Sequence, residues 1–190
     1  MKIFAAAAFA VMLATGAQAA VVASGVTQVG DTGGINAQGA DVAIASNNTA
    51  YNNTPTSPVA DWVWIGDINN NNNAVFEFAF DLTGYDLSTV SLSGVWGVDN
   101  SGTIDLNGTV IATLTFGFPA FQTVNNYGTM DSSLFNAGAN LLTFTALDQG
   151  GPGAIRATAI VEATAVPLPA GAPLLIGGLA LLGWMRKRKA

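Results

Sequence analysis

The chain has 190 residues, with 12 acidic and 6 basic side chains and neither histidine nor cysteine. The missing residue types exclude a Ser-His-Asp triad, a Cys-His pair and any zinc site built from thiolate or imidazole. All twelve acidic residues lie between residues 20 and 165, where Arg156 is the one basic residue, so this body has a net charge of −11. Such a charge disfavours nucleic acid and anionic lipid as partners.

The first segment has the three parts of a secretory signal. Lys2 provides a short positive region, Ile3–Leu13 are uninterruptedly apolar, and Ala17-Gln18-Ala19 forms an A-x-A cleavage site. Eleven apolar residues are too few for a stable membrane anchor. We therefore expect residues 1–19 to be a signal peptide that forms a helix before cleavage, and the mature chain to begin at Ala20.

Residues 20–165 predict one domain of the all-β class, because short β-branched and aromatic runs alternate with turn residues. Asn107-Gly108 is the preferred pair for a type I′ hairpin turn. Phe76, Phe78 and Phe80 would share one strand face. We expect an antiparallel β-sandwich. The expected strands are Val26–Val29, Val42–Ala45, Asp61–Ile65, Ala74–Phe80, Val90–Trp96, Thr103–Leu106, Thr109–Phe116, Leu141–Leu147 and Ala154–Val161.

Acid–base chemistry in this chain would depend on carboxylates alone, as in glycosidases. The candidates are Glu77, Asp81, Asp99 and Asp105. The three aspartates stand beside turn residues, where Asp usually bonds the local backbone. We therefore expect no enzymatic activity.

Calcium is the one cofactor that the sequence suggests. The stretch from Asp67 begins like an EF-hand loop, but Asn72 stands where glycine is needed and Phe78 where a bidentate glutamate is needed. A structural calcium ion held by Asp99, Asn100 and backbone carbonyls stays open, with plain turn chemistry as the alternative.

Sugar binding would need an exposed aromatic ring that stacks on a pyranose, with amide or carboxylate groups for its hydroxyls. Tyr127, in the turn-rich stretch VNNYGT, is the first candidate for such a ring. Trp62 and Trp64 are two residues apart, so they should be both buried or both exposed. Trp96 falls in the middle of an expected strand and is assigned to the core.

The C-terminal segment predicts a membrane helix. Residues Ala170–Met185 carry no charge and are followed by Arg186–Lys189, which should stay on the cytoplasmic side. Pro167 and Pro169 keep the preceding backbone extended, as a protease requires. Residues 166–190 are thus expected to hold the chain in the membrane before it is cleaved.

Two resemblances follow from these residues. Val166-Pro167-Leu168-Pro169-Ala170, the apolar helix and the basic tail resemble the VPLPA-CTERM sorting signal, a variant of the PEP-CTERM class of Gram-negative bacteria that make exopolysaccharide. That resemblance implies an exosortase as the processing partner and release to the cell surface or matrix. The order FEFAFDLTG, LSGVWGVDNSGTIDLNGT and FNAGANLLTFTALDQGG resembles galactose-binding-like jelly-roll domains, common in carbohydrate-binding modules.

Together these features predict an exported, non-enzymatic surface or matrix protein associated with exopolysaccharide through adhesion or carbohydrate binding. Two alternatives stay open. One is a purely structural matrix component without a ligand site, and the other is a glycosidase or lyase that uses two carboxylates.

Overall fold

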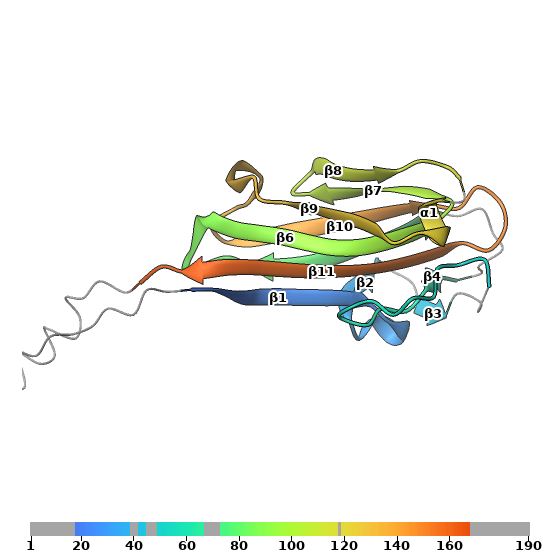
Figure 1. The fold of residues 1–190 in the computed structure, drawn as a ribbon, viewed down its shortest axis with the longest axis horizontal. Coiled ribbons are helices and arrows are strands. Elements are labelled where there is room, and N and C mark those ends of the chain that lie inside the picture. Colours follow the sequence, from blue (N-terminus) through green and yellow to red (C-terminus); the bar gives the residue numbers. More distant parts are fainter. Residues whose placement is uncertain (1–17, 39–41, 45–48, 67–72, 118, 168–190) are drawn as a thin grey trace, which may run out of the picture.

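A computed structural model describes residues 18–38, 42–44, 49–66, 73–117 and 119–167. Within these residues eleven strands form two packed layers, joined by turns, one four-residue α-helix and two 3₁₀ helices at Val29–Asp31 and Ser132–Leu134 (Figure 1). The elements are β1 (Ala19–Thr27), β2 (Gly34–Ala37), β3 (Val42–Ile44), β4 (Val63–Ile65), β5 (Asn73–Asp81), β6 (Tyr85–Asp99), β7 (Ser101–Leu106), β8 (Thr109–Leu114), α1 (Pro119–Gln122), β9 (Asn125–Thr129), β10 (Ala139–Leu147) and β11 (Ala154–Ala165).

The first layer is built around β11. One edge of β11 pairs antiparallel with β6, and the other edge pairs with β1 and then, further toward the start of β11, with β4. β9 extends the layer beyond β6, and β3 extends it beyond β4. This layer carries the candidate site on its outer face.

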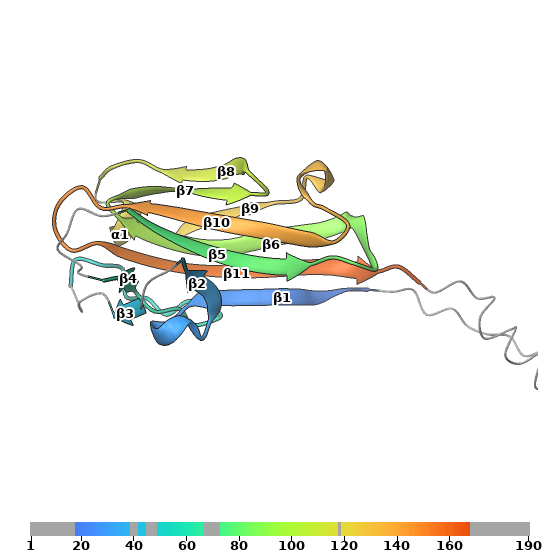
Figure 2. The same cartoon turned by 180° about the vertical axis from the view of Figure 1, so that it is seen from behind.

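The second layer has the order β2-β5-β10-β7-β8 (Figure 2). β10 pairs with β5 along its whole length and with β7 on its other edge. A short parallel pairing of β1 with β2 links the two layers at one side. The predicted antiparallel β-sandwich is confirmed.

The core lies between the layers. On β5, Phe76, Phe78 and Phe80 are buried while Glu77 and Ala79 are not, which confirms the predicted alternation. Trp96 of the first layer reaches Gly102 of the second, where an added Cβ would lie 3.3 Å from the indole. Trp96 is therefore a core residue, as predicted.

The β7–β8 hairpin turns at the pair identified from the sequence. Asn107 and Gly108 have φ angles of 51° and 85°, the left-handed conformation that a type I′ turn requires at both positions. The Asn107 side chain also accepts a hydrogen bond from the Leu141 amide at 2.9 Å and donates to the Leu134 carbonyl at 2.8 Å. The turn thus fixes the neighbouring end of β10.

Two strands were not predicted. β9 contains the NNYGT stretch that the sequence analysis placed in a turn, and β2 lies in a Gly- and Asn-containing segment. β1 and β6 are also longer than predicted, beginning at Ala19 and Tyr85.

Both ends of the described body leave from the same end of the sandwich. Ala19 pairs with Thr164, and the Val166 amide donates to the Gly84 carbonyl at 2.8 Å. Residues 1–17 of the predicted signal peptide (1–19) and residues 168–190 of the predicted sorting segment (166–190) lie outside the described residues. The helices within the described ranges are too short to cross a membrane.

Candidate functional site

The outer face of the first layer is covered over the start of β11 by the loop of residues 49–62. Arg156 projects from this face and is only 7% exposed. Its guanidinium donates to the backbone carbonyl of Asn52 at 2.7 Å and to that of Thr54. The one basic residue of the body therefore fixes this loop over the sheet.

Trp62 is held in the same covering loop. Its ring stacks on Tyr51 at 4.8 Å, and its indole N–H donates to the Asn52 carbonyl at 3.1 Å. The ring edge lies over Gly97 of β6, where an added Cβ would come within 2.7 Å of the indole. Glycine at position 97 thus allows the loop to approach the sheet closely.

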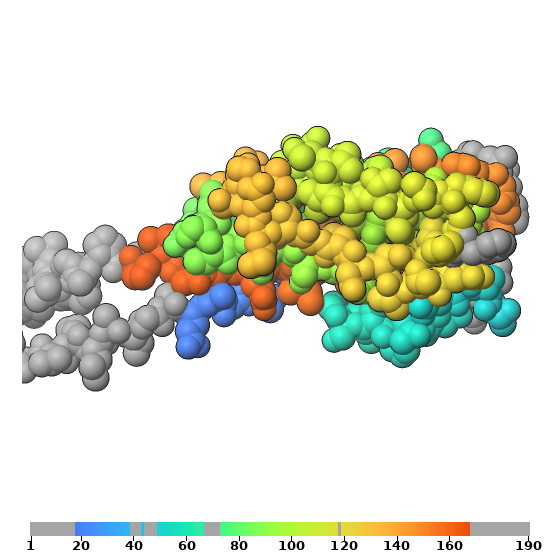
Figure 3. All heavy atoms as spheres, turned by 45° about the horizontal axis from the view of Figure 1, so that its top comes forward, coloured from blue at the N-terminus to red at the C-terminus, as the bar shows by residue number. Residues whose placement is uncertain are grey.

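A third wall comes from the segment that follows β8. The backbone N–H of Asn52 donates to the Phe121 carbonyl at 2.8 Å, and the Phe121 ring meets the Tyr51 ring edge-on at 5.7 Å. In Figure 3 this yellow segment lies alongside the teal loop. Thr123 and Val124 follow α1, and Val124 is 48% exposed.

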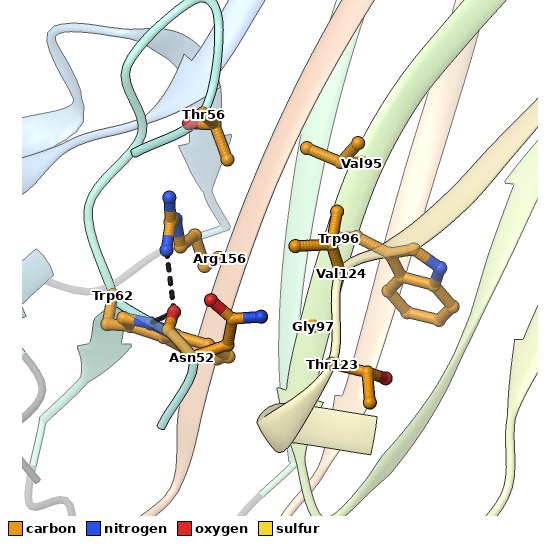
Figure 4. Close-up of a pocket in the computed structure, with 9 residues that line it drawn as sticks. All are labelled: Asn52, Thr56, Trp62, Val95, Trp96, Gly97, Thr123, Val124 and Arg156. Carbon is orange, nitrogen blue, oxygen red and sulfur yellow. Dashed lines mark hydrogen bonds between the residues drawn. The ribbon is translucent and has the colours of Figure 1, made fainter. Parts of the chain in front are cut away.

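These three parts border a shallow, open pocket on the outer face of the sheet. Figure 4 shows the side-chain amide of Asn52 pointing across the pocket toward Gly97 and Thr123, whereas the Trp96 ring points to the other side of β6. The lining residues are Asn52, Thr56, Trp62, Val95, Trp96, Gly97, Thr123, Val124 and Arg156. The walls are mainly apolar, with a few polar groups.

Arg156 supplies the charge of this pocket. Burial lowers the pKa of Arg156, and the nearby carboxylate of Asp61 opposes that change. An arginine stays protonated in proteins despite such a shift. Its two terminal nitrogens donate to the Asn52 and Thr54 carbonyls and its Nε is buried, so Arg156 holds the pocket wall in place.

No carboxylate is among the residues described as lining this pocket. Of the four acid candidates, Glu77 lies on β5 and Asp105 on β7, both in the second layer, and Asp99 ends β6 outside the pocket lining. Asp81 is exposed and accepts the Thr83 amide at 2.6 Å, the local turn bond predicted for it. The pocket therefore presents no pair of carboxylates for glycoside hydrolysis.

The prediction that Tyr127 is exposed is wrong. Tyr127 lies on β9 and is 8% exposed, because β9 pairs with β6 and points this ring between the layers. Its hydroxyl donates to the Thr158 carbonyl at 2.6 Å, and its ring meets Phe144 edge-on at 5.9 Å. Tyr127 is a core residue and offers no ring face to a sugar.

The two tryptophans are both buried, one of the two outcomes that their spacing allowed. Trp64 is fully buried, and its ring lies where a Cβ on Gly153 would come within 2.4 Å. Trp64 therefore cannot contact a sugar. Trp62 is 9% exposed and lines the pocket, so it alone of the three aromatic candidates reaches a possible ligand surface.

The predicted metal-ligand pair lies at the turn between β6 and β7. Asp99 is 7% exposed and accepts hydrogen bonds from the Tyr51 hydroxyl at 3.1 Å and from the Asn100 amide group at 2.6 Å. The Asn100 side-chain oxygen accepts the Gln149 amide at 2.7 Å. Within the described part of the chain, no three His, Cys, Asp or Glu side chains gather as a metal site.

The sorting residues are described only in part. Val166 and Pro167 follow β11 and are exposed, with Val166 at 54%. Leu168, Pro169 and Ala170 lie outside the described residues. The structure thus places the start of the motif at the surface, and the sorting role stays a prediction.

Sequence analysis did not identify most of the pocket. Asn52 and Thr56 stand in a turn-rich loop, and Thr123 and Val124 follow α1; they meet only through folding. One signal was available for Arg156, since a single basic residue in an acidic body is unusual enough to ask what it contacts.

No protein-family model matches the sequence, and no curated protein does. Among solved structures, the chain is similar to a family 35 carbohydrate-binding module from an environmental isolate, with a TM-score of 0.40, 12% identity, and coverage of 75% of this chain and 98% of that one. It is similar to the CBM36-1 domain of a multidomain xylanase from the hindgut metagenome of Trinervitermes trinervoides (TM-score 0.36, 8% identity, 77% and 100% coverage). A family 35 module from Clostridium thermocellum is another (0.35, 13%, 75% and 98%).

Proposed function

We propose that this chain is an exported, non-enzymatic protein of the cell surface or matrix, which associates with exopolysaccharide through the pocket over β6 and β11. The observation that carries this proposal is the composition of the pocket. Apolar walls from Trp62, Val95 and Val124 surround the Asn52 amide and the buried Arg156 guanidinium. Apolar walls with a few convergent polar groups are typical of small-molecule sites.

The chemistry of the pocket suits one face of a sugar ring, because the site is shallow and its walls are mainly apolar with a few polar groups. The C–H face of a pyranose would lie against the apolar walls, and its hydroxyls would meet the Asn52 side-chain amide. A ring within a longer chain can bind in this way because the pocket is open on the outer face of the sheet.

The position of the pocket is compatible with sorting through the two termini. Arg156 is near the start of β11, and Thr164, eight residues later, pairs with Ala19. At about 3.3 Å per residue, the pocket and the paired ends are ~26 Å apart along the strand. A body held through its C-terminal segment would thus present the pocket away from the membrane.

Binding of the exported protein to purified exopolysaccharide, measured with the Val124→Asp variant, tests the proposal. Val124 is half-exposed at the rim, so this change should block the pocket without emptying the core. The matched control is Val110→Asp on β8, since Val110 is 55% exposed in the second layer. We expect Val124→Asp to weaken binding at least tenfold and the control to bind normally.

If both variants bind as the parent does, the pocket is not the site. If the parent chain binds no polysaccharide, the chain is a structural matrix component without a ligand site.

A further inference from the structure

Two carboxylates are buried side by side at the end of the sandwich where β6 meets the loop between β10 and β11. Asp99 closes β6 and Asp148 follows β10; they are 7% and 5% exposed. The backbone N–H of Asn100 donates to the Leu147 carbonyl at 2.8 Å, which holds the two chain segments together. Residues 49 positions apart in sequence thus place two acidic groups in one buried region.

The hydrogen-bond acceptors in this region exceed the available donors. The Tyr51 hydroxyl has one proton, but it lies 3.1 Å from the Asp99 carboxylate and 3.0 Å from the Pro152 carbonyl. One oxygen of Asp148 accepts the Gly150 amide at 3.0 Å. The other oxygen, Oδ2, is buried and has no hydrogen-bond partner among the described residues.

No basic side chain of the described residues neutralises these two groups. Arg156 is the only basic residue between positions 20 and 165, and its guanidinium donates to the carbonyls of Asn52 and Thr54. A buried carboxylate without a partner is strongly unfavourable, so this region needs a positive charge or a proton.

We infer that Asp99, Asp148 and the Pro152 carbonyl form a binding site for a hard divalent cation, with calcium the expected ion. All three groups offer oxygen, which calcium prefers, and no nitrogen or sulfur ligand is present to favour a transition metal. The site differs from the pair suggested by the sequence. Asn100 is engaged with Asp99 and Gln149, so it positions the turn, and Asp148 provides the second carboxylate.

The site has a structural role that follows from what it connects. Tyr51 belongs to the loop that covers the pocket, Asp99 to β6, and Pro152 to the loop before β11. An ion bound only in the folded state stabilises that state by mass action. This inference does not depend on polysaccharide binding and is tested without any sugar.

Calcium titration of the full exported protein by calorimetry tests the inference, with Asp148→Asn and Asp99→Asn as the site variants. Asparagine keeps an oxygen that can accept the Gly150 or Asn100 bond and removes a buried charge, so both variants should fold. Asp131→Asn is the control, because it removes an exposed acidic charge elsewhere. Magnesium chloride and sodium chloride at matched ionic strength are the ion controls.

We expect one calcium ion per chain, affinity in the ~10⁻⁴–10⁻³ M range of extracellular sites, and at least a tenfold weaker affinity in each site variant. The control variant should bind as the parent does, and calcium should raise the unfolding temperature beyond the sodium control. Failure of the folded parent to bind calcium would overturn the inference, as would equal binding by Asp148→Asn. The inference would also be overturned if Asp99 and Asp148 only share a proton. The stability would then depend on pH without any response to calcium.

Discussion

Arg156 on β11 donates from its guanidinium to the backbone carbonyl of Asn52, joining residues 104 positions apart in the sequence. Because the same guanidinium also reaches the Thr54 carbonyl, one side chain fixes both ends of a short loop segment. The pocket exists because this loop is held over β6 and β11 rather than extending into solvent. The stability of the loop is therefore the first property to test.

Replacement of Arg156 by Met should destabilise the fold and loosen the loop. The change removes the guanidinium donor of the Thr54 carbonyl and leaves the Asn52 carbonyl with only the Trp62 indole N–H, at a cost of about 1–3 kcal/mol. Urea unfolding gives the free-energy change, and hydrogen exchange at Asn52 and Thr54 reports the loop. The free energy of unfolding of Arg156→Lys should lie between those of the parent and the Met variant, since lysine keeps the charge but lacks the planar guanidinium. Equal stability of the parent and the Met variant would show that the loop is held by other contacts.

Tyr127→Phe should affect stability alone. The Tyr127 hydroxyl donates to the Thr158 carbonyl inside the sandwich, and its loss should cost about 1–2 kcal/mol. Polysaccharide binding should not change, because this ring is buried between the layers. Thermal unfolding and a binding assay on the same sample separate the two effects. Weaker binding by a variant of unchanged stability would restore Tyr127 as a sugar contact.

Three exposed aspartates should make the fold sensitive to acid. Hydrogen bonds from Thr83, Ser88 and Ser133 lower the pKa values of Asp81, Asp86 and Asp131, respectively. Their folded pKa values lie below the unfolded value of ~3.9, so their contribution is present above that pH and is lost as pH falls through the folded values.

NMR titration of the side-chain carboxyl signals checks this expectation. The three midpoints should lie below ~3.9. Asp86→Asn should remove the Asp86 part of the acid-dependent loss while keeping the turn, because the asparagine oxygen can still accept the Ser88 amide. Midpoints at or above the unfolded value would contradict the turn geometry.

The sequence predicted strands well where the pattern is local and missed them where pairing decides. The Phe76, Phe78 and Phe80 alternation and the Asn107-Gly108 turn are properties of adjacent residues. β9 is different, because NNYGT is polar and favours turns on its own. It becomes a strand through pairing with β6, where Gly94 lies opposite Tyr127.

The pocket could not be predicted for a related reason. Its groups come from a loop before β4, from β6, from the segment after α1 and from β11. The sequence identifies Trp62 as a candidate, but whether its ring is buried depends on Gly97, a residue 35 positions away whose missing Cβ makes room for it. The partner of Asp99 at the buried acidic region, Asp148, is likewise set by the register of β7 with β10.

The two predicted processing sites lie next to strands that pair. Ala19 opens β1 opposite Thr164, and Val166 directly follows β11. We expect the extracellular form to begin at Ala20 and to lack Arg186–Lys189, because the signal and sorting segments are removed. Intact-mass measurement of protein from the culture medium checks both ends. A secreted form that retains the basic tail would contradict sorting by cleavage.

The most direct test of the central claim is an NMR titration of the exported protein with fragments of exopolysaccharide. Binding at the pocket predicts saturable shifts of the Gly97, Thr123 and Val124 amides and of the Trp62 indole N–H. The Thr103 and Thr113 amides, on β7 and β8 of the second layer, should stay unchanged. Saturable shifts that cluster on the second layer, or no shifts at any fragment concentration, would contradict the claim.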